Sequence, residues 1–462
     1  MRIALVHYHL HPGGLTSVVY HQAQALIDQG ESVLILTRDE QPPEQPLPVF
    51  YVKELHYEGP SAPVLLARAL LKAMNVYWGQ AADILHVHNP QVQTHEALIP
   101  ALHILKSQNI RLLLQIYDLT QDFRPDRYVP DSYPENCHYG LITSQDYSYL
   151  YRFGMKPEGL HLIPHEVASI SSTPGMERKR YLYPVRAVRR KNIGEALLLS
   201  LFIPKGRTIA ITLPPVDNLN QWIYRYWRNF AASLKLPVEF DVGLDTPLSD
   251  SFGSSFCTIT TSIKGSLGFS FLEPWTAGRA VIGRRINICR DFEKAGIRFD
   301  ALYDAIHIPR VYIASSVLLK KCTQAIQHMY ASFSLKEPPY IKQMITDELF
   351  SQETFDFGRF NEELQEALIR TLVSNDVACQ DVAEINPFLT SMANWQPDEA
   401  LIEQNRGIIL DQYGKERIGK SLQDMYDMVL YTPVIHRNSP LKLLDMYFDP
   451  LRFSLLEVDH TW

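Results

Sequence analysis

The sequence has few cysteines, no long apolar run and no excess of positive charge. Its five cysteines are scattered and lack CxxC spacing, which predicts reduced thiols in a cytoplasmic protein and argues against a disulfide framework or a zinc site. No apolar run reaches the ~18–20 residues that a membrane span needs, so any membrane contact is expected to be peripheral. The net charge of -7 argues against a general nucleic-acid binder, which would be basic.

The length of 462 residues exceeds what one hydrophobic core normally supports. Apolar strands alternate with amphipathic helices in two separate series, and such alternation indicates an α/β fold with parallel sheets. Between the series, residues 168–178 are small, polar and turn-forming, as is typical of a linker. From about residue 317 the pattern turns helical. We therefore predict an N-terminal domain over residues 1–172, a second α/β domain over 173–316 and a helical extension over 317–462.

A cluster of cations marks the start of the second α/β series. The predicted strand Tyr181–Val185 is followed by four cations and then by an amphipathic helix. Cations at a strand-to-helix junction, with free N–H groups at the helix start, favour an anion, and open α/β sheets bind ligands at the carboxyl ends of their strands. We predict that Arg186 and Lys191 hold phosphate groups. The alternative is a solvated basic turn.

An acidic residue stands out in the second informative stretch, which reads GSLGFSFLEPWTAGRAVIG from Gly265 to Gly283. Glu273 lies among apolar side chains, and burying an unpaired carboxylate is costly. We therefore expect it to face a ligand, with the hydroxyls of a nucleotide ribose as its partners. A structural role at the start of a helix is the alternative.

Polar residues also follow two strands of the N-terminal series. The turn HPGG, which contains Gly13 and Gly14, leads from the first strand into a helix, and its amides are candidates for phosphate binding; a simple tight turn is the alternative. The strand DILHVH ends in His88 and is followed by Asn89, and both are predicted to face a cleft. We interpret His86 and His88 as pointing to opposite faces of this strand, so that one of them is a core histidine.

Three histidines near the N-terminus, His7, His9 and His11, have the alternating spacing of a metal cluster. The HPGG turn redirects the last of them, and no neighbouring carboxylate or cysteine completes a tetrahedral shell. We therefore predict no metal and expect His9 or His11 to contact an acceptor. Asp118, at the end of a later strand, is a candidate for orienting acceptor hydroxyls or for capping a turn.

Four features, in matching order along the chain, resemble the GT-B-fold glycosyltransferases, specifically the large retaining family often called GT4. The GG turn with its helix resembles that family's opening loop, and DILHVHN resembles its second strand motif. Arg186 and Lys191, five positions apart, match its paired donor-phosphate cations. The stretch GFSFLEPWTAGRAVIG is similar to the second half of its EX7E motif. The resemblance covers most of residues 1–296 and the late helix 416–430.

The resemblance implies two Rossmann-like domains facing a cleft, with a C-terminal helix crossing back onto the N-terminal domain. It implies that a nucleotide-diphosphate sugar binds the second domain, that the acceptor binds mainly the first, and that the anomeric configuration is retained without metal or cofactor. Arg186 and Lys191 would be catalytic, because they stabilise the charge of the leaving diphosphate. The expected donor contacts are Gly13, Gly14, Arg186, Lys191, Gly268, Phe269, Ser270 and Glu273.

The sequence departs from this family at two positions. The first carboxylate of the EX7E motif falls on Gly265, and the histidine of a strand-ending His-Asp pair is replaced by Tyr117. Two interpretations stay open: a transferase that moves a hexose to a saccharide or a small polyol or glycerate-type acceptor, or a non-catalytic nucleotide-sugar binder that keeps the fold. The expected acceptor or sugar contacts are His88, Asn89, Tyr117 and Asp118.

Overall fold

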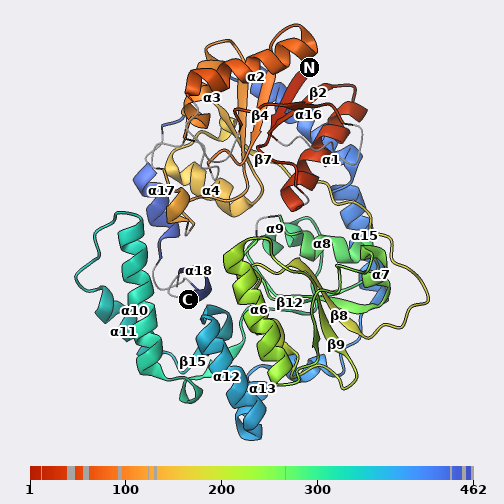
Figure 1. Cartoon of the computed structure of the whole chain (residues 1–462), viewed down its shortest axis with the longest axis vertical. Coiled ribbons are helices and arrows are strands. Elements are labelled where there is room, and N and C mark those ends of the chain that lie inside the picture. The colour runs from red at the N-terminus through yellow and green to blue at the C-terminus, as the bar shows by residue number, and fades with distance from the viewer. Residues whose placement is uncertain are drawn as a thin grey trace. The chain divides into compact units, whose positions relative to one another are not determined.

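The computed structural model describes residues 1–11, 13–38, 47–55, 62–91, 96–122, 124–129, 133–265, 267–437, 440–449 and 454–458. The chain divides into two compact units (Figure 1). Unit 1 comprises Met1–Ala168 and Asp411–Phe448, and unit 2 comprises Ser169–Leu410 and Asp449–Trp462. The stretch 317–462, expected as a helical extension with part crossing back to the N-terminal domain, is shared between the units. Pro12 of the HPGG turn and Ser266 lie outside the described residues.

Unit 1 is built on a parallel sheet with the strand order β3-β2-β1-β4-β5-β6-β7. In Figure 1 the blue helix α16 lies beside the red helix α1, although the two come from opposite ends of the sequence. The strands are β1 Arg2–Val6, β2 Ser32–Thr37, β3 Val49–Tyr51, β4 Ile84–His88, β5 Arg111–Ile116, β6 His138–Leu141 and β7 Leu160–Leu162. The helices are α1 Gly14–Asp28, α2 Pro63–Trp78, α3 Leu98–Lys106, α4 Ser144–Phe153, α16 Lys415–Tyr431 and α17 Pro440–Tyr447.

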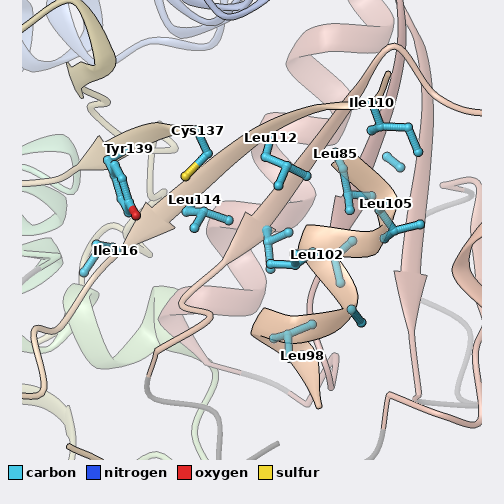
Figure 2. Close-up of a cluster of buried hydrophobic side chains, with 14 of the residues drawn as sticks. Leu85, Leu98, Leu102, Leu105, Ile110, Leu112, Leu114, Ile116, Cys137 and Tyr139 are labelled. Atoms are coloured by element: carbon cyan, nitrogen blue, oxygen red, sulfur yellow. The ribbon is translucent and has the colours of Figure 1, made fainter. Parts of the chain in front are cut away.

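Both faces of this sheet are covered, which explains why its strands read as continuous apolar runs. On β5, Leu112 and Leu114 belong to the core that includes α3, whereas Leu113 belongs to the core that includes Ile418 of α16. Figure 2 shows the leucines of α3 beside those of β4 and β5. Each fully buried leucine contributes roughly 1.5–3 kcal/mol. Helix α16 therefore belongs to the core of unit 1 even though it is encoded far from the rest of it.

Unit 2 is built on a second parallel sheet with the order β10-β9-β8-β11-β12-β13. Its strands are β8 Arg180–Arg186, β9 Thr208–Leu213, β10 Val238–Glu239, β11 Ser255–Thr260, β12 Val281–Arg284 and β13 Leu302–Tyr303. The helices that alternate with them are α5 Ile193–Leu199, α6 Asn218–Ser233, α7 Leu248–Gly253, α8 Phe269–Thr276 and α9 Cys289–Lys294. The two α/β series predicted from the sequence are confirmed, because each forms one parallel sheet; β3 in unit 1 and β13 in unit 2 were not predicted.

A helical region completes unit 2, together with an antiparallel hairpin that the sequence pattern did not predict. The hairpin pairs β14 His307–Pro309 with β15 Thr354–Asp356. Strands of three residues are too short to show a recognisable period, and two helices separate them in sequence. The helices of this region are α10 Ser315–Ser332, α11 Ile341–Ser351, α12 Glu362–Ser374, α13 Asp376–Ile385, α14 Pro387–Met392, α15 Glu399–Gln412 and α18 Leu455–Val458.

Candidate functional site

The candidate site of unit 2 lies at the point where its strand order reverses. After β8 the chain adds β9 and β10 on one side of it, and β11 to β13 follow on the other side. The neighbours β8 and β11 are therefore followed by loops that lead in opposite directions. Open α/β sheets bind their ligands outside the carboxyl ends of the strands at such a switch point. The loop after β8 carries the cation cluster, and the loop after β11 leads to α8 and Glu273.

The two cations predicted to bind phosphate lie in the loop after β8. Arg186 ends β8, is half-buried and donates from Nη1 to the Pro214 carbonyl at 3.2 Å. Lys191 ends a short 3-10 helix, Arg189–Lys191, and is also half-buried. Burial, with a smaller contribution from the charge of Arg190, lowers the pKa of Lys191 to about 7. Within the described residues Lys191 has no ion pair, so its charge lacks the partner that an anion would supply.

Hydrogen bonds tie this loop to the loop after β11. The Thr261 hydroxyl donates to the Lys191 carbonyl and to the Asn192 carbonyl, at 3.0 Å each. The Tyr183 hydroxyl also donates to the Lys191 carbonyl, at 2.5 Å. The Ile263 amide donates to the carbonyl of the preceding cation, Arg190, at 3.1 Å. The backbone that carries Lys191 is therefore fixed by buried hydroxyls at the switch point.

Glu273 lies in the second turn of α8. The helix begins after Gly268, whose φ of 68° is left-handed and whose Cβ would lie 2.4 Å from Phe292, so only glycine fits there. Gly268 is the N-cap of this helix, and no side chain forms a cap bond there. Glu273 therefore does not cap the helix. Its carboxylate is half-buried, and burial raises its pKa to about 7. No hydrogen bond or ion pair of this carboxylate occurs among the described residues.

The remaining predicted donor contacts start two helices. Phe269 and Ser270 form the first turn of α8 and are half-buried. In unit 1, Gly13 is the N-cap of α1 and Gly14 its first residue, and the helix has no side-chain cap. A Cβ on Gly13 would meet only the His11 carbonyl, at 3.9 Å, so space is open above these amides. The N-terminus of α1 follows β1 at the switch point of the unit 1 sheet.

The predicted acceptor contacts of unit 1 follow β4 and β5 and contact one another. His88 Nδ1 and the Tyr117 hydroxyl lie 2.9 Å apart, and the Tyr117 amide donates to Asn89 Oδ1 at 3.4 Å. His88 and Tyr117 are buried, and Asn89, which has a left-handed φ of 51°, is 9% exposed. Asp118 is half-buried and pairs with Arg124 at 3.3 Å. The structure brings His88, Asn89 and Tyr117 together, with the Tyr117 hydroxyl already engaged by His88, whereas Asp118 contacts Arg124.

The interpretation that His86 and His88 face opposite sides of their strand was wrong. Their rings stack with centroids 4.4 Å apart, because side chains two residues apart on a strand share a face. His86 Nδ1 lies 2.7 Å from the hydroxyl of Tyr426 on α16. Burial lowers the pKa of His7 and of His86 to about 3, and the pKa of His88 falls well below 6.5 for the same reason. This end of the sheet therefore presents neutral hydrogen-bonding groups at physiological pH.

The histidines after β1 do not form a metal-binding group. The ring centroids of His7 and His9 lie 4.9 Å apart, and those of His9 and His11 lie 5.0 Å apart. Even so, no three His, Cys, Asp or Glu side chains in the described part of the chain are arranged to hold a metal ion.

Sequence reasoning missed the buried acids near the loop after β8. Glu195 on α5 and Glu362 on α12 are both 0% exposed. Glu195 lies in the apolar helix IGEALLL, so the rule that selected Glu273, a carboxylate in an apolar run, would also have selected Glu195. Nothing in the sequence linked Glu362 to this loop, because 173 residues separate it from its partner Arg189.

No protein-family model matches the chain. Among curated proteins, mannosylglucosyl-3-phosphoglycerate synthase of Petrotoga mobilis is 22% identical over 360 residues, which cover 70% of this chain and 68% of that protein. Among solved structures, sucrose-phosphate synthase from Thermosynechococcus elongatus has a TM-score of 0.56 at 16% identity, over 92% of this chain and 98% of that one.

A second solved structure, Anabaena HepE in complex with UDP and glucose, has a TM-score of 0.55 at 10% identity, over 92% of this chain and 99% of that one. At these identities the likeness concerns the fold. Together with the two parallel sheets it confirms the predicted architecture of two Rossmann-like domains, called GT-B. No helix of the described residues is long and apolar enough to cross a membrane.

Proposed function

We propose that this protein is a retaining, metal-independent glycosyltransferase that moves a hexose from a nucleotide-diphosphate sugar to a hydroxyl acceptor. One observation carries the proposal: at the switch point of unit 2, a cation and a carboxylate lie half-buried, and neither has an ion-pair partner among the residues that the structure describes. Lys191 and Glu273 both have pKa values shifted to about 7 by burial, which means that each charge is disfavoured until a ligand compensates it. A nucleoside diphosphate supplies both compensations, phosphate oxygens for the cation and ribose hydroxyls for the acid.

Two cations in and before the loop after β8 can stabilise the charge that develops when the sugar separates from the diphosphate. The bond between the anomeric carbon and the diphosphate oxygen breaks, and Arg186 and Lys191 stabilise the negative charge that gathers on the diphosphate. The acceptor oxygen bonds to the anomeric carbon from the same face. Its proton passes to the leaving phosphate oxygen, so that no protein nucleophile is needed.

The acceptor in this proposal is a hydroxyl compound, and we favour a glycerate-type molecule. The relative from Petrotoga mobilis is a mannosylglucosyl-3-phosphoglycerate synthase by name, which supports an acceptor of this kind. The neutral groups at the end of the unit 1 sheet, with His88 and Tyr117 among them, match hydroxyl recognition better than recognition of a second diphosphate. HepE, solved with UDP and glucose, supports a uridine nucleotide as the first donor to test.

A second candidate function is a nucleotide-sugar binder without transfer activity. It is favoured by Gly265, which has no carboxylate where the EX7E motif has its first one, and by Tyr117, whose hydroxyl is taken up by His88. A carboxylate could be accommodated at position 265, since a Cβ there would meet only Ile286 at 3.5 Å.

The discriminating experiment is incubation with UDP-, GDP- and ADP-linked hexoses, with and without glycerate-type acceptors, while nucleoside diphosphate release is measured. Acceptor-stimulated release of one nucleotide, with a product that keeps the donor's anomeric configuration, supports the transferase. Tight binding with no release in any combination supports the binder. If none of the nucleotides binds, both candidates fail.

A further inference from the structure

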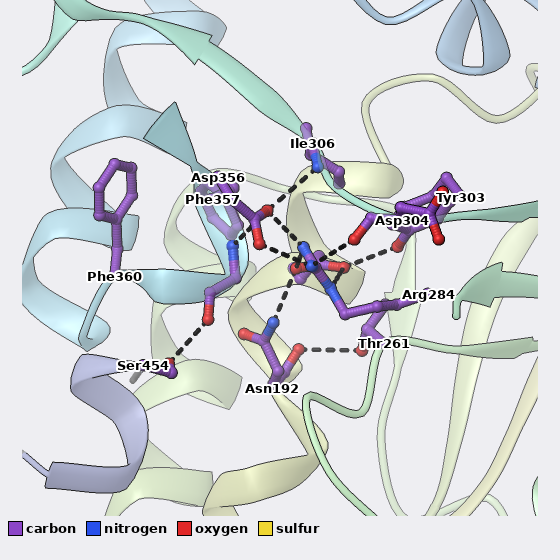
Figure 3. A network of polar contacts seen from close by, with 12 residues as sticks. Asn192, Thr261, Arg284, Tyr303, Asp304, Ile306, Asp356, Phe357, Phe360 and Ser454 are labelled. Atoms are coloured by element: carbon purple, nitrogen blue, oxygen red, sulfur yellow. Dashed lines mark hydrogen bonds and ion pairs between the residues drawn. The ribbon is translucent and has the colours of Figure 1, made fainter. Parts of the chain in front are cut away.

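A buried network of charges lies behind the loop that carries Lys191. Arg284, at the end of β12, donates from Nε and Nη2 to both oxygens of Glu195, at 2.8 and 2.7 Å. It also donates to both oxygens of Asp356, at 2.7 Å each, and the Tyr303 hydroxyl donates to Glu195 at 2.7 Å. Figure 3 shows Arg284, Tyr303 and Asp356 of this network, which come from β12, β13 and β15. Every carboxylate oxygen of the network thus has a donor.

The same region reaches the loop on both sides of Lys191. Glu362, in the first turn of α12, accepts from Arg189 Nε at 2.6 Å and Nη2 at 2.7 Å. Gln365, one turn later, donates from Nε2 to Asn192 Oδ1 at 2.9 Å, and Asn192 in turn donates to Glu195 at 2.8 Å. The residues two before and one after Lys191 are therefore held by side chains from α12.

Two glycines show how closely these parts are fitted. A Cβ on Gly194 would lie 2.0 Å from Gln365 Oε1, so a side chain there would displace the Gln365 amide. A Cβ on Gly358 would lie 2.5 Å from the Arg284 guanidinium. Asn192 has φ 52° and ψ 58°, a left-handed conformation that costs roughly 1–2 kcal/mol outside glycine. Such strain persists only where the surroundings enforce it, and here Glu195 and Gln365 do so.

The charges of the network fit a role in shaping the loop better than a role in stability alone. Burial, the largest influence, raises the pKa of the Asp356 carboxyl, but the charge and hydrogen bonds of Arg284, together with the amides of Gly358 and Ile306, hold that pKa below its usual range. Buried ion pairs gain little stability over apolar residues of similar volume, because desolvation offsets their attraction. Their position behind a loop that carries the half-buried cations Arg189, Arg190 and Lys191 favours a conformational role.

We propose that the segment Asp356–Gln365, here called the brace, is the positioning element of the candidate diphosphate loop, with Glu362 and Gln365 as its positioning residues. Glu362 neutralises Arg189 and turns it away from ligand binding, and Gln365 holds Asn192. The backbone of Lys191 is then fixed from both sides and its ammonium group is presented to the ligand. The identity of that ligand, a nucleoside diphosphate, rests on the proposed function.

The test compares two carboxylates that each accept two hydrogen bonds from an arginine: Glu362, which is buried behind the loop, and Glu239, which is half-buried. Glu362→Gln removes the Arg189 pair, and Gln365→Leu removes the Asn192 bond at similar volume. The matched control is Glu239→Gln, because Glu239 accepts two bonds from Arg180, at 3.2 and 2.6 Å, at the other end of β8. Binding of UDP, GDP and ADP is measured by calorimetry, and folding is checked by thermal unfolding.

We expect Glu362→Gln to weaken binding of the preferred nucleotide by about tenfold or more, the scale for a small misplacement of a binding group. Glu239→Gln should lower the unfolding temperature without changing nucleotide binding. The double variant Arg189→Gln/Glu362→Gln should bind within about a factor of two of the worse single variant, because both act through one contact. In turnover, the KM for the donor should rise while the KM for the acceptor stays constant.

Equal nucleotide binding by the wild-type protein and Glu362→Gln would overturn the brace, as would equal losses in Glu362→Gln and Glu239→Gln. If the wild-type protein binds none of the nucleotides, the proposed function fails and the brace is judged by hydrogen exchange of the amides of residues 188–193. Faster exchange in Glu362→Gln than in Glu239→Gln supports the brace, and equal exchange rejects it.

Discussion

Unit 1 and unit 2 arrange their strands in the same order around a switch point, yet the two switch points present different chemistry. In unit 2 the loops carry full charges, and Lys191 and Glu273 lack partners within the described residues. In unit 1 the strand ends carry imidazole and phenol groups, and His88 and Tyr117 bond to each other. One topology therefore supports two kinds of site, because the side chains after the strands decide what is bound.

The difference follows from what burial does to each kind of group. Burial makes a histidine neutral, and the ring then still donates at one nitrogen and accepts at the other. A lysine or glutamate that is buried without a partner is instead destabilised in its charged form. A counter-charge or a hydrogen-bonding ligand then stabilises it. Under the proposed function, unit 1 would therefore bind hydroxyl groups, and unit 2 would bind an anion with adjacent hydroxyls.

The largest effect is expected from removing the cations of unit 2. Arg186→Ala and Lys191→Ala should each lower donor-dependent turnover by roughly 10²-fold or more, because a stabiliser of the leaving diphosphate is lost. Lys205→Ala is the matched control, since Lys205 is exposed and precedes β9 at the opposite end of the sheet. Near-normal turnover in both site variants would contradict the phosphate assignment.

The next effect concerns the pH dependence of nucleotide binding. Lys191 is protonated below its pKa of about 7, and Glu273 is ionised above its pKa of about 7, so affinity should peak near pH 7 and decline on both sides. Each decline can reach about tenfold per pH unit, the slope for one proton. Glu273→Gln should remove the acidic decline and leave the alkaline one. Calorimetry from pH 5.5 to 9 checks both curves; an unchanged acidic limb in the variant would exclude Glu273.

A smaller effect is expected from the neutral site of unit 1. Tyr117→Phe removes the hydroxyl that bonds to His88 and frees that imidazole, with a stability loss of about 0.5–1.5 kcal/mol for one hydrogen bond. The KM for the acceptor should change several-fold, while nucleotide affinity stays constant because unit 2 is untouched. A change in nucleotide affinity alone would show that the division of roles between the units is wrong.

The smallest effect is a gain in stability. The folded-state pKa of Lys191 is depressed from 10.5 to about 7, so between these values the unfolded chain binds a proton that the folded chain does not. The burial of Lys191 therefore lowers the free energy of unfolding most at pH 7 and below, and this loss shrinks as pH rises from 7 toward 10.5. Lys191→Met should raise the unfolding temperature at pH 7 by a few degrees, about 2–4 °C for each kcal/mol recovered, and the gain should shrink by pH 9.5. A variant less stable than wild type at pH 7 would mean that the charge is paired in the folded protein.

Much of the local structure was predictable because it depends on local periodicity. Strand β8, Arg180–Arg186, extends the predicted strand Tyr181–Val185 by one residue at each end, and the cation cluster lies at a strand-to-helix junction as expected. The hairpin β14–β15 was missed because its strands are short and distant in sequence. The error over His86 and His88 came from misapplying the two-residue period of a strand. The sequence alone was enough to avoid it.

The sequence by itself determined the two α/β series, the switch-point loops and the charged residues that follow their strands, since apolar periodicity and turn residues act over short distances. The resemblance already placed a C-terminal helix on the N-terminal domain, but only the tertiary structure decided which distant side chains become partners. Helix α16 supplies Tyr426 to His86 across 340 residues, and Glu362 reaches Arg189 across 173. Such partners are chosen by burial, because a buried polar group takes a partner wherever the packed chain brings one, and no local pattern records that choice.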